Sequence, residues 1–307
     1  MEEGILVTVP LSFHWHHRAL QSFCMITNDR RLLTEEQIRF FHEEGYLCLD
    51  QISPAAEVEK LIGIYDRLFS VKAGRNQGAH FDMVGHDKDE EPPVSPQIIN
   101  PVLFAPELKE TEFRANAMIL ARQLLGPEAR YDFEHAILKP PKIGAPTPWH
   151  QDEAFRRDHP PGYQEISVWM PLQDVDETNG CLEYLPGSHR KHVLRHASPG
   201  NDPLVHALEC VEDFEAAKAV ACPLPAGGCV IHHCRTLHHS TANRSSMPRR
   251  AYILGFAVPP EGNPRLSPGF PWNEEKMAPS KVRKLAWRRR GGFVVEVMRK
   301  IRARLTR

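Results

Sequence analysis

The sequence predicts a mainly β protein, an antiparallel sandwich or barrel with helices packed on one side. Two observations predict this fold class. Strong helical signals come first, up to residue 125, and short apolar runs broken by Gly, Pro and Asn follow from about residue 130. Because these runs do not alternate with helices, βαβ units are not expected. The 27 prolines agree with a fold that is rich in turns.

Three helices are expected in the first 125 residues. The segment 34–45 begins with a capping box and ends at a glycine, after which a short strand is expected. The segment 53–69 begins with Ser-Pro and spaces its apolar residues as a helix does. The segment 106–125 begins at a proline and stops before Gly-Pro. The polar segment 71–101 is too long for an ordinary connection, so we interpret it as a mobile lid or substrate loop.

Short β-like runs dominate the rest of the chain, and Asn179-Gly180 between two of them predicts a tight hairpin. The runs cover residues 134–139, 167–172, 181–185, 229–234 and 251–258. We expect one catalytic domain over residues 31–270. An extension over residues 1–30 shows no clean period and is expected to be disordered or not part of the fold, and residues 271–307 form a basic carboxyl-terminal segment.

Composition excludes several classes of protein. The net charge of -1 gives no overall attraction to nucleic acid, which is not expected as a partner. No apolar run reaches the roughly 18 to 20 residues that a membrane span needs. Seven cysteines without a C-x-x-C pair indicate reduced thiols and a cytoplasmic location. The oligomeric state is left open.

The carboxyl-terminal segment is the basic part of the chain. Residues 276–307 contain twelve Lys or Arg, and the run 294–305 could form a basic amphipathic helix. Peripheral membrane contact through this helix is one interpretation. A helix that is solvated or packs on the domain is the interpretation that we favour.

Candidate metal ligands lie in the segment P-W-H-Q-D-E-A-F, where His150 and Asp152 are two residues apart. In an extended strand, residues i and i+2 project from the same face, so both side chains can reach one ion. A second H-x-D pair, His80 and Asp82, lies in the polar segment, where a solvated histidine is the better interpretation. A third candidate ligand lies downstream in T-L-H-H-S-T, where His238 and His239 are adjacent. Two histidines and one carboxylate leave open positions and suit Fe(II) oxygen chemistry.

Four segments, in this order, resemble the phytanoyl-CoA dioxygenase family over roughly residues 33–260. They read L-T-E-E-Q-I-R-F-F-H-E-E-G-Y, P-W-H-Q-D-E-A-F, V-W-M-P-L-Q-D-V-D-E-T-N-G-C-L-E-Y-L-P-G-S-H and H-H-S-T-A-N-R-S-S-M-P-R-R. The resemblance implies a double-stranded β-helix of jelly-roll, cupin-like type braced by amino-terminal helices. It also implies a dioxygenase that uses Fe(II), 2-oxoglutarate and O2, hydroxylates a small organic or acyl substrate, and releases succinate and CO2.

The family's distal motif is H-G-S-x-x-N followed by an arginine eleven residues after the histidine. It places the ligand at His238 and the arginine at Arg249, whereas counting from His239 would select Arg250. The match of Ser240 to the family's serine favours the first register. The resemblance then implies that Arg249 holds the distal carboxylate of 2-oxoglutarate, with a hydrogen bond from Ser240. Further co-substrate pocket positions implied by the family are Gln151, Trp169 and His135.

Two other hypotheses stay open. One is a catalytically silent metal-binding or ligand-binding protein on the same fold, against which Arg249 argues because a binder has no need of it. The other is a cupin-like enzyme with another metal, but such sites usually take three histidines and a glutamate, and no such cluster precedes His150. The substrate is a small molecule whose identity the sequence does not reveal. Arg156 and Arg157, which follow the ligand pair, suggest that it is anionic.

Overall fold

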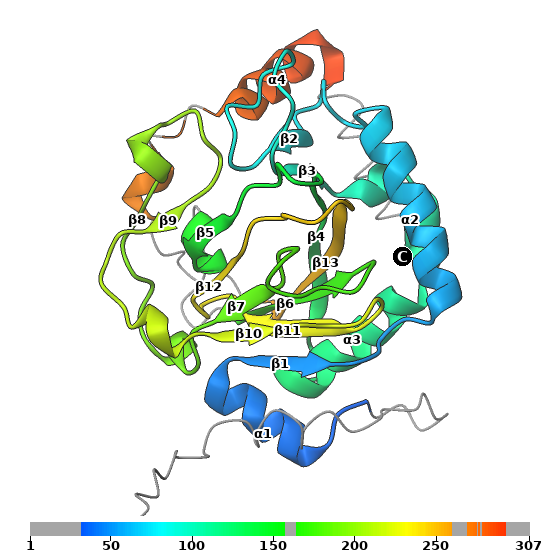
Figure 1. Cartoon of the computed structure of the whole chain (residues 1–307), viewed down its shortest axis with the longest axis vertical. Helices are drawn as coiled ribbons and strands as arrows, with labels where there is room; N and C mark the ends of the chain where they lie inside the picture. Colours follow the sequence, from blue (N-terminus) through cyan, green and yellow to red (C-terminus); the bar gives the residue numbers. More distant parts are fainter. Residues whose placement is uncertain (1–31, 157–163, 260–268, 275, 277, 293–307) are drawn as a thin grey trace, which may run out of the picture.

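Two antiparallel sheets make up the centre of the protein, and helices cover the larger sheet (Figure 1). The computed structural model describes residues 32–156, 164–259, 269–274, 276 and 278–292. The larger sheet has seven strands in the order β1 (Tyr46–Leu49), β11 (Cys229–His233), β6 (Glu165–Pro171), β13 (Arg249–Ala257), β4 (Arg130–Lys139), β3 (Pro96–Ile99) and β2 (His80–Asp82). The smaller sheet has the order β10 (Val220–Cys222), β7 (Leu182–Tyr184), β12 (His238–Ser240) and β5 (Thr147–His150). A separate pair joins β8 (His196–Ala197) and β9 (Glu209–Cys210).

The helices precede and follow the sheets in the chain. The α-helices are α1 (Glu35–Glu44), α2 (Ala55–Ser70), α3 (Glu112–Leu125) and α4 (Pro279–Trp287). Single turns of tighter helix are η1 (Pro101–Leu103), η2 (Pro106–Glu110), η3 (Asp152–Phe155), η4 (Ser188–Arg190), η5 (Pro199–Asn201), η6 (Ala216–Lys218) and η7 (Pro271–Asn273), and η8 (Arg288–Gly292) is a π-helical turn. The predicted mainly β, jelly-roll class with bracing amino-terminal helices is therefore confirmed.

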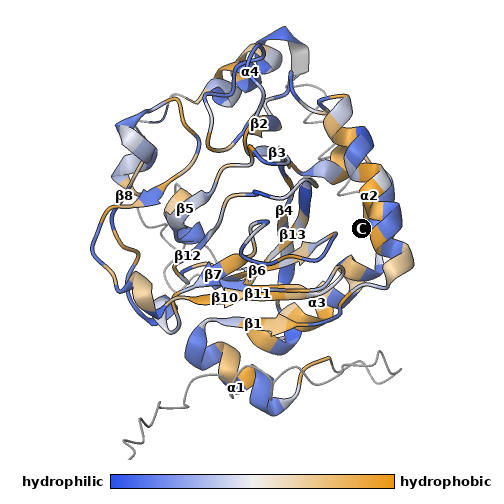
Figure 2. Cartoon of the chain, in the orientation of Figure 1, coloured by the Kyte–Doolittle hydropathy of each residue, from blue (hydrophilic) through white to orange (hydrophobic). Residues whose placement is uncertain are grey.

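The larger sheet has two buried faces, because its side chains alternate between them. The outer face carries Ala136, Val168 and Leu254 and packs in one core with the apolar sides of α2 and α3. Figure 2 shows these helices with apolar and polar residues on different sides, and β11 as a largely apolar strand. The inner face carries Trp169 and Val230, which belong to a second core that also includes residues of the smaller sheet. The inner face is the one that borders the candidate site.

The first two predicted helices are present, and the third is divided. A capping box starts α1 and Gly45, with φ 81°, ends it. Residues 106–125 form the turn η2 and then α3, not one helix. The reason is Thr111, whose extended backbone interrupts the helix and whose hydroxyl accepts a hydrogen bond from the amide of Arg114 at 3.3 Å.

The predicted hairpin at Asn179-Gly180 is wrong. Gly180 does adopt a left-handed conformation, with φ 96°, as such a turn requires. The strands on either side, β6 and β7, nevertheless belong to different sheets. The carboxylate of Asp176 accepts the amide of Thr178 at 2.8 Å and stabilises a turn that carries the chain across from the larger sheet to the smaller one.

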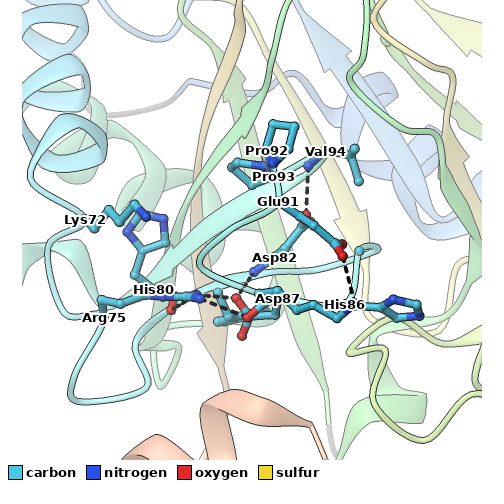
Figure 3. Close-up of a pocket in the computed structure, with 13 residues that line it drawn as sticks. Lys72, Arg75, His80, Asp82, His86, Asp87, Glu91, Pro92, Pro93 and Val94 are labelled. Carbon is cyan, nitrogen blue, oxygen red and sulfur yellow. Dashed lines mark hydrogen bonds and ion pairs between the residues drawn. The ribbon is translucent and has the colours of Figure 1, made fainter.

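The polar segment 71–101 is not a free loop, since it contributes β2 and β3 to the larger sheet. His80 is only 6% exposed, so its interpretation as a solvated histidine is wrong. The Asp82 carboxylate accepts amides across the loop, from Val94 at 2.8 Å and Ser95 at 2.9 Å. Figure 3 shows the side chains of this segment around a small cavity of about 100 Å³. The segment that we predicted to be a mobile lid is therefore held in the sheet by its own polar groups.

A buried carboxylate also connects this segment to the carboxyl-terminal part of the chain. Asp87 pairs with Arg75 (Figure 3) and with Arg283 of α4. Lys276 donates to backbone carbonyls at 205–207. The described part of the basic segment therefore packs on the domain. The run 294–305 and the extension 1–30 lie outside the described residues, and the three domain boundaries stay predictions. Within the described ranges, no helix is long and apolar enough to cross a membrane.

Candidate metal and co-substrate site

Two strands of the smaller sheet bring the predicted ligands together. His150 on β5 lies directly opposite His238 on β12, and their ring centroids are 4.3 Å apart. Asp152 follows at the start of η3, with Oδ1 at 3.5 Å from His150 Nε2 and 3.7 Å from His238 Nε2. One donor atom from each of the three residues lies within 4.8 Å of the others. The structure thus places all three predicted ligands around one point.

Both ligand histidines direct Nε2 toward the position of the metal. Nδ1 of His150 is 2.8 Å from the carbonyl of Pro148, and Nδ1 of His238 is 2.8 Å from the carbonyl of Thr236. Each Nδ1–H donates to its carbonyl, which leaves the Nε2 lone pair for an ion. Burial lowers the pKa of His238 well below its usual value, so the ring is neutral.

Asp152 is ionised at the same point. Burial alone would raise its pKa, but the neighbouring His238, His150 and His232 lower it well below its usual value. Two imidazole nitrogens and one carboxylate oxygen are the donor set of the non-haem Fe(II) facial triad, and these residues fit that ion.

His239 does not compete for this position. Its side chain projects from the opposite face of β12, where Nε2 pairs with Glu183 at 3.1 Å and the ring centre lies 4.1 Å from that of Trp149, with the two planes tilted by 31°. Strand alternation therefore selects His238. The rival pair at His80 and Asp82 lies in the β2 segment, where the carboxylate is used by loop amides.

Gln151 faces away from the three ligands. Its amide group donates to the carbonyl of Arg235 at 2.7 Å and accepts the amide of Leu194 at 2.8 Å. Its backbone N–H donates to Nε2 of His196 at 3.2 Å. Since residues 150 and 152 share one face, residue 151 must occupy the other. The structure does not bring Gln151 to the pocket expected for it, and its contacts hold the backbone between two ligands instead.

Arg249 lies on the inner face with an unsatisfied charge. It is 2% exposed, and among the described residues its Nε and Nη1 have no hydrogen-bond partner. The guanidinium carbon is 5.5 Å from the centre of the Trp169 ring. Burial lowers the pKa of Arg249 to about 9. Arg250 points outward, donating from Nε to Asp66 at 2.8 Å, so the geometry favours Arg249 as the inward arginine.

A second buried cation, which the sequence analysis missed, lies beside Arg249. Lys139 pairs with Arg249 across β4 and β13 and is fully buried. Its Nζ donates to Ser240 Oγ at 2.7 Å and to the carbonyl of Thr241 at 2.6 Å. Burial and the charge of Arg249 lower the pKa of Lys139 well below its usual value. Alternation along β4 from His135 could have found Lys139, four residues away on the same face.

This pair of cations has a clear chemical preference. Holding a guanidinium and an amine side by side in buried, charged form is costly unless an anion joins them. A carboxylate is the anion that a guanidinium binds in two-point fashion. The unsatisfied atoms of Arg249 therefore fit the distal carboxylate of 2-oxoglutarate, with Ser240 and Lys139 beside it.

The remaining predicted pocket residues line the same inner face. His135 on β4 lies opposite Ile253 and is half-buried. Burial lowers the pKa of His135 to about 4, so the ring is neutral near Asp152. Phe133 lies 5.2 Å from His135, ring centre to ring centre, and occupies the space over Gly255. The wall next to the candidate site is therefore mostly apolar and aromatic.

Comparisons with known proteins agree on one family. The family model for phytanoyl-CoA dioxygenase matches residues 41–251. A protein of Stutzerimonas stutzeri named as a probable alpha-ketoglutarate-dependent hypophosphite dioxygenase is 28% identical over 226 residues, 73% of this chain and 78% of that protein. Human peroxisomal phytanoyl-CoA dioxygenase is 27% identical, with 75% of this chain and 70% of that protein covered.

Solved structures agree as well. EvdO2 from Micromonospora carbonacea var. aurantiaca, crystallised with 2-oxoglutarate, is 35% identical, with a TM-score of 0.63 over 76% of this chain and 95% of that one. The epimerase SnoN, crystallised with Fe3+, alpha ketoglutarate and nogalamycin RO, is 21% identical with a TM-score of 0.60 and shares the fold over 77% of this chain and 94% of that one.

Proposed function

The chain belongs to the phytanoyl-CoA dioxygenase family and is a non-haem Fe(II)/2-oxoglutarate-dependent dioxygenase, and on this basis we propose a role for each site residue. His150, Asp152 and His238 hold the iron. Arg249, with Ser240 and Lys139, binds the distal carboxylate of 2-oxoglutarate, and Trp169 and His135 line the co-substrate pocket. With O2, the bound iron and co-substrate supply an oxidative decarboxylation that releases succinate and CO2 and hydroxylates the substrate.

The chain's own residues bind and orient rather than transfer protons. His135 is neutral and His238 is neutral, so neither is suited to serve as an acid at neutral pH. The inner face excludes water with Trp169 and its apolar neighbours. The observation that carries the proposal is the buried guanidinium of Arg249, whose Nε and Nη1 have no hydrogen-bond partner in the part of the chain that the structure describes, because a silent metal site has no use for it.

We propose a small organic or acyl substrate that is recognised largely through apolar contacts. Phe133 and Ile137 share the half-buried inner face of β4, and the ring of Phe155 lies 5.7 Å from that of His150. The anionic character that Arg156 suggested has less support, since Arg156 already pairs with Asp132 at 2.8 Å and with Glu165. Arg157 lies outside the described residues.

A cytoplasmic location is part of the same proposal. The six cysteines within the described ranges all have free thiols, which a reducing compartment would maintain. Peripheral membrane contact through the basic segment stays a prediction, and the packing of α4 on the domain favours the alternative that we preferred.

Succinate formation from 2-oxoglutarate tests the proposed function. Wild type with Fe(II) should form succinate, and His150→Ala should lose this activity because a ligand is removed. His80→Ala is the matched control, since it alters the other H-x-D pair and should retain activity. Equal succinate from wild type and His150→Ala would refute the assignment. No succinate from wild type, with metal binding intact, would favour the silent binding protein.

A further inference from the structure

The two oxygens of the Asp152 carboxylate have different surroundings. Oδ1 faces the Nε2 atoms of His150 and His238. Oδ2 is held from behind: Ser167 Oγ donates to it at 3.0 Å, and His232 Nε2 lies 3.0 Å from it. One oxygen is therefore directed to the metal position and the other is occupied by hydrogen bonds.

The two donors reach Oδ2 because of strand pairing. Ser167 on β6 and His232 on β11 are directly opposite in the antiparallel register, so their side chains project from the same face. Both belong to the larger sheet, whereas the ligand histidines belong to the smaller one. The contact thus spans the two sheets and orients a side chain at the start of η3.

His232 is itself fixed at its other nitrogen. Its Nδ1 lies 2.9 Å from the hydroxyl of Tyr184, a fully buried side chain that stacks on Tyr46 with ring centres 5.0 Å apart. With Nε2–H donated to Asp152, Nδ1 accepts the Tyr184 hydroxyl. Both ring nitrogens are engaged, so His232 has no free lone pair for the iron although its ring centre is only 4.4 Å from that of His238.

We infer that His232 and Ser167 are positioning residues that restrict Asp152 to metal binding through one oxygen. This inference rests on the proposed function. A carboxylate released at Oδ2 can rotate and offer both oxygens to an ion. A second carboxylate oxygen on the ion would occupy a position that the keto and carboxylate oxygens of 2-oxoglutarate, or O2, require. The hydrogen bonds to Oδ2 thereby keep that position open.

Binding measurements on the full chain test this inference without turnover. The affinity of the apoprotein for Mn(II), and of the Mn(II)-loaded protein for 2-oxoglutarate, are measured by calorimetry. The visible charge-transfer absorption of the anaerobic Fe(II)–2-oxoglutarate complex reports chelation. His232→Ala should weaken 2-oxoglutarate binding about 10- to 100-fold and reduce the absorption. His232→Gln should recover most of both, because its amide N–H can donate to the same oxygen.

Controls separate positioning from folding. Ser167→Ala removes only one hydroxyl and should weaken 2-oxoglutarate binding in the same direction. Its matched control is Ser95→Ala, since Ser95 is fully buried and its hydroxyl has no partner among the described residues. Circular dichroism is used to check that each variant is folded. If His232→Ala does not fold, Ser167→Ala provides the test.

The outcomes are distinct. Wild-type affinities and absorption in both His232→Ala and Ser167→Ala would overturn the inference and leave the proposed function intact. A loss in His232→Ala that His232→Gln does not recover, with Ser167→Ala unaffected, would also overturn it, because packing would then explain the loss. Failure of wild type to bind 2-oxoglutarate in the presence of metal would overturn the proposed function together with the inference.

Discussion

Replacing Arg249 by methionine should separate two effects of its buried charge: the destabilisation of the apoprotein and the binding of 2-oxoglutarate. Burial lowers the pKa of Arg249 from the usual guanidinium value to about 9, and this shift corresponds to roughly 5 kcal/mol. Because the guanidinium is charged at neutral pH, the folded apoprotein bears this cost. Methionine has a similar length and no charge. We therefore expect Arg249→Met to raise the free energy of unfolding of the apoprotein by about 1–4 kcal/mol, the remainder being offset by lost contact with Trp169.

The co-substrate should act against this difference. Bound 2-oxoglutarate supplies the missing carboxylate to wild type, and a ligand at a hundredfold excess over its Kd stabilises by about 2.7 kcal/mol. Arg249→Met should gain none of this. Urea denaturation with and without 2-oxoglutarate, in the presence of Mn(II) and without O2, measures both effects.

Arg250→Met is the matched control on the next residue of the strand. Arg250 pairs with Asp66, whose side chain is 55% exposed. Removing this ion pair should lower the free energy of unfolding by about 0–1 kcal/mol and leave the stabilisation by 2-oxoglutarate unchanged. A wild-type response to 2-oxoglutarate in Arg249→Met, or its loss in Arg250→Met, would refute the assignment of Arg249.

Three further predictions concern the co-substrate pocket, the inner wall and the Asp87 cluster. Lys139→Met should raise the KM for 2-oxoglutarate about tenfold in succinate assays while Mn(II) affinity is unchanged; a shift in Mn(II) affinity alone would contradict it. Gly255→Ala places a Cβ 2.1 Å from Phe133 and should cost about 1–3 kcal/mol in urea denaturation, whereas the control Gly63→Ala, which meets no atom within 4 Å, should not destabilise. Hydrogen bonds and ion pairs lower the pKa of Asp87 in the folded protein. Its ionised carboxylate therefore contributes to the free energy of unfolding above pH 3.8, the pKa in the unfolded chain, and this contribution is lost as pH falls through the pKa in the folded protein. The destabilisation by Asp87→Asn at pH 7 should therefore shrink below pH 3.8, and a constant difference would disprove it.

Errors in the sequence analysis share one physical origin. Segment 71–101 has the polar composition of a loop, but Asp82 and Asp87 use that polarity to close the segment onto itself and onto α4. Asn179-Gly180 has the backbone conformation that its residues favour, yet the turn joins two sheets instead of two paired strands. In each case the local conformational preference was predicted correctly, but contacts with residues distant in sequence determined the structure.

The candidate site also has a part that the sequence predicts and a part that it does not. His150 and Asp152 are two residues apart, and strand periodicity places them on one face. Ser240 and Arg249 keep the spacing to His238 of the phytanoyl-CoA dioxygenase motif, and this resemblance implied a 2-oxoglutarate site. These are local properties of the chain.

Only the tertiary structure decided what surrounds that site. The pairing of β4 with β13 places Lys139 beside Arg249, and the pairing of β6 with β11 directs Ser167 and His232 to Asp152. Sequence separations of 15 to more than 100 residues carry no periodic signal, so these contacts arise from strand register and cannot be derived from spacing. The type of chemistry was therefore encoded in the sequence, and the orientation and charge environment of its ligands were decided by how the two sheets assemble.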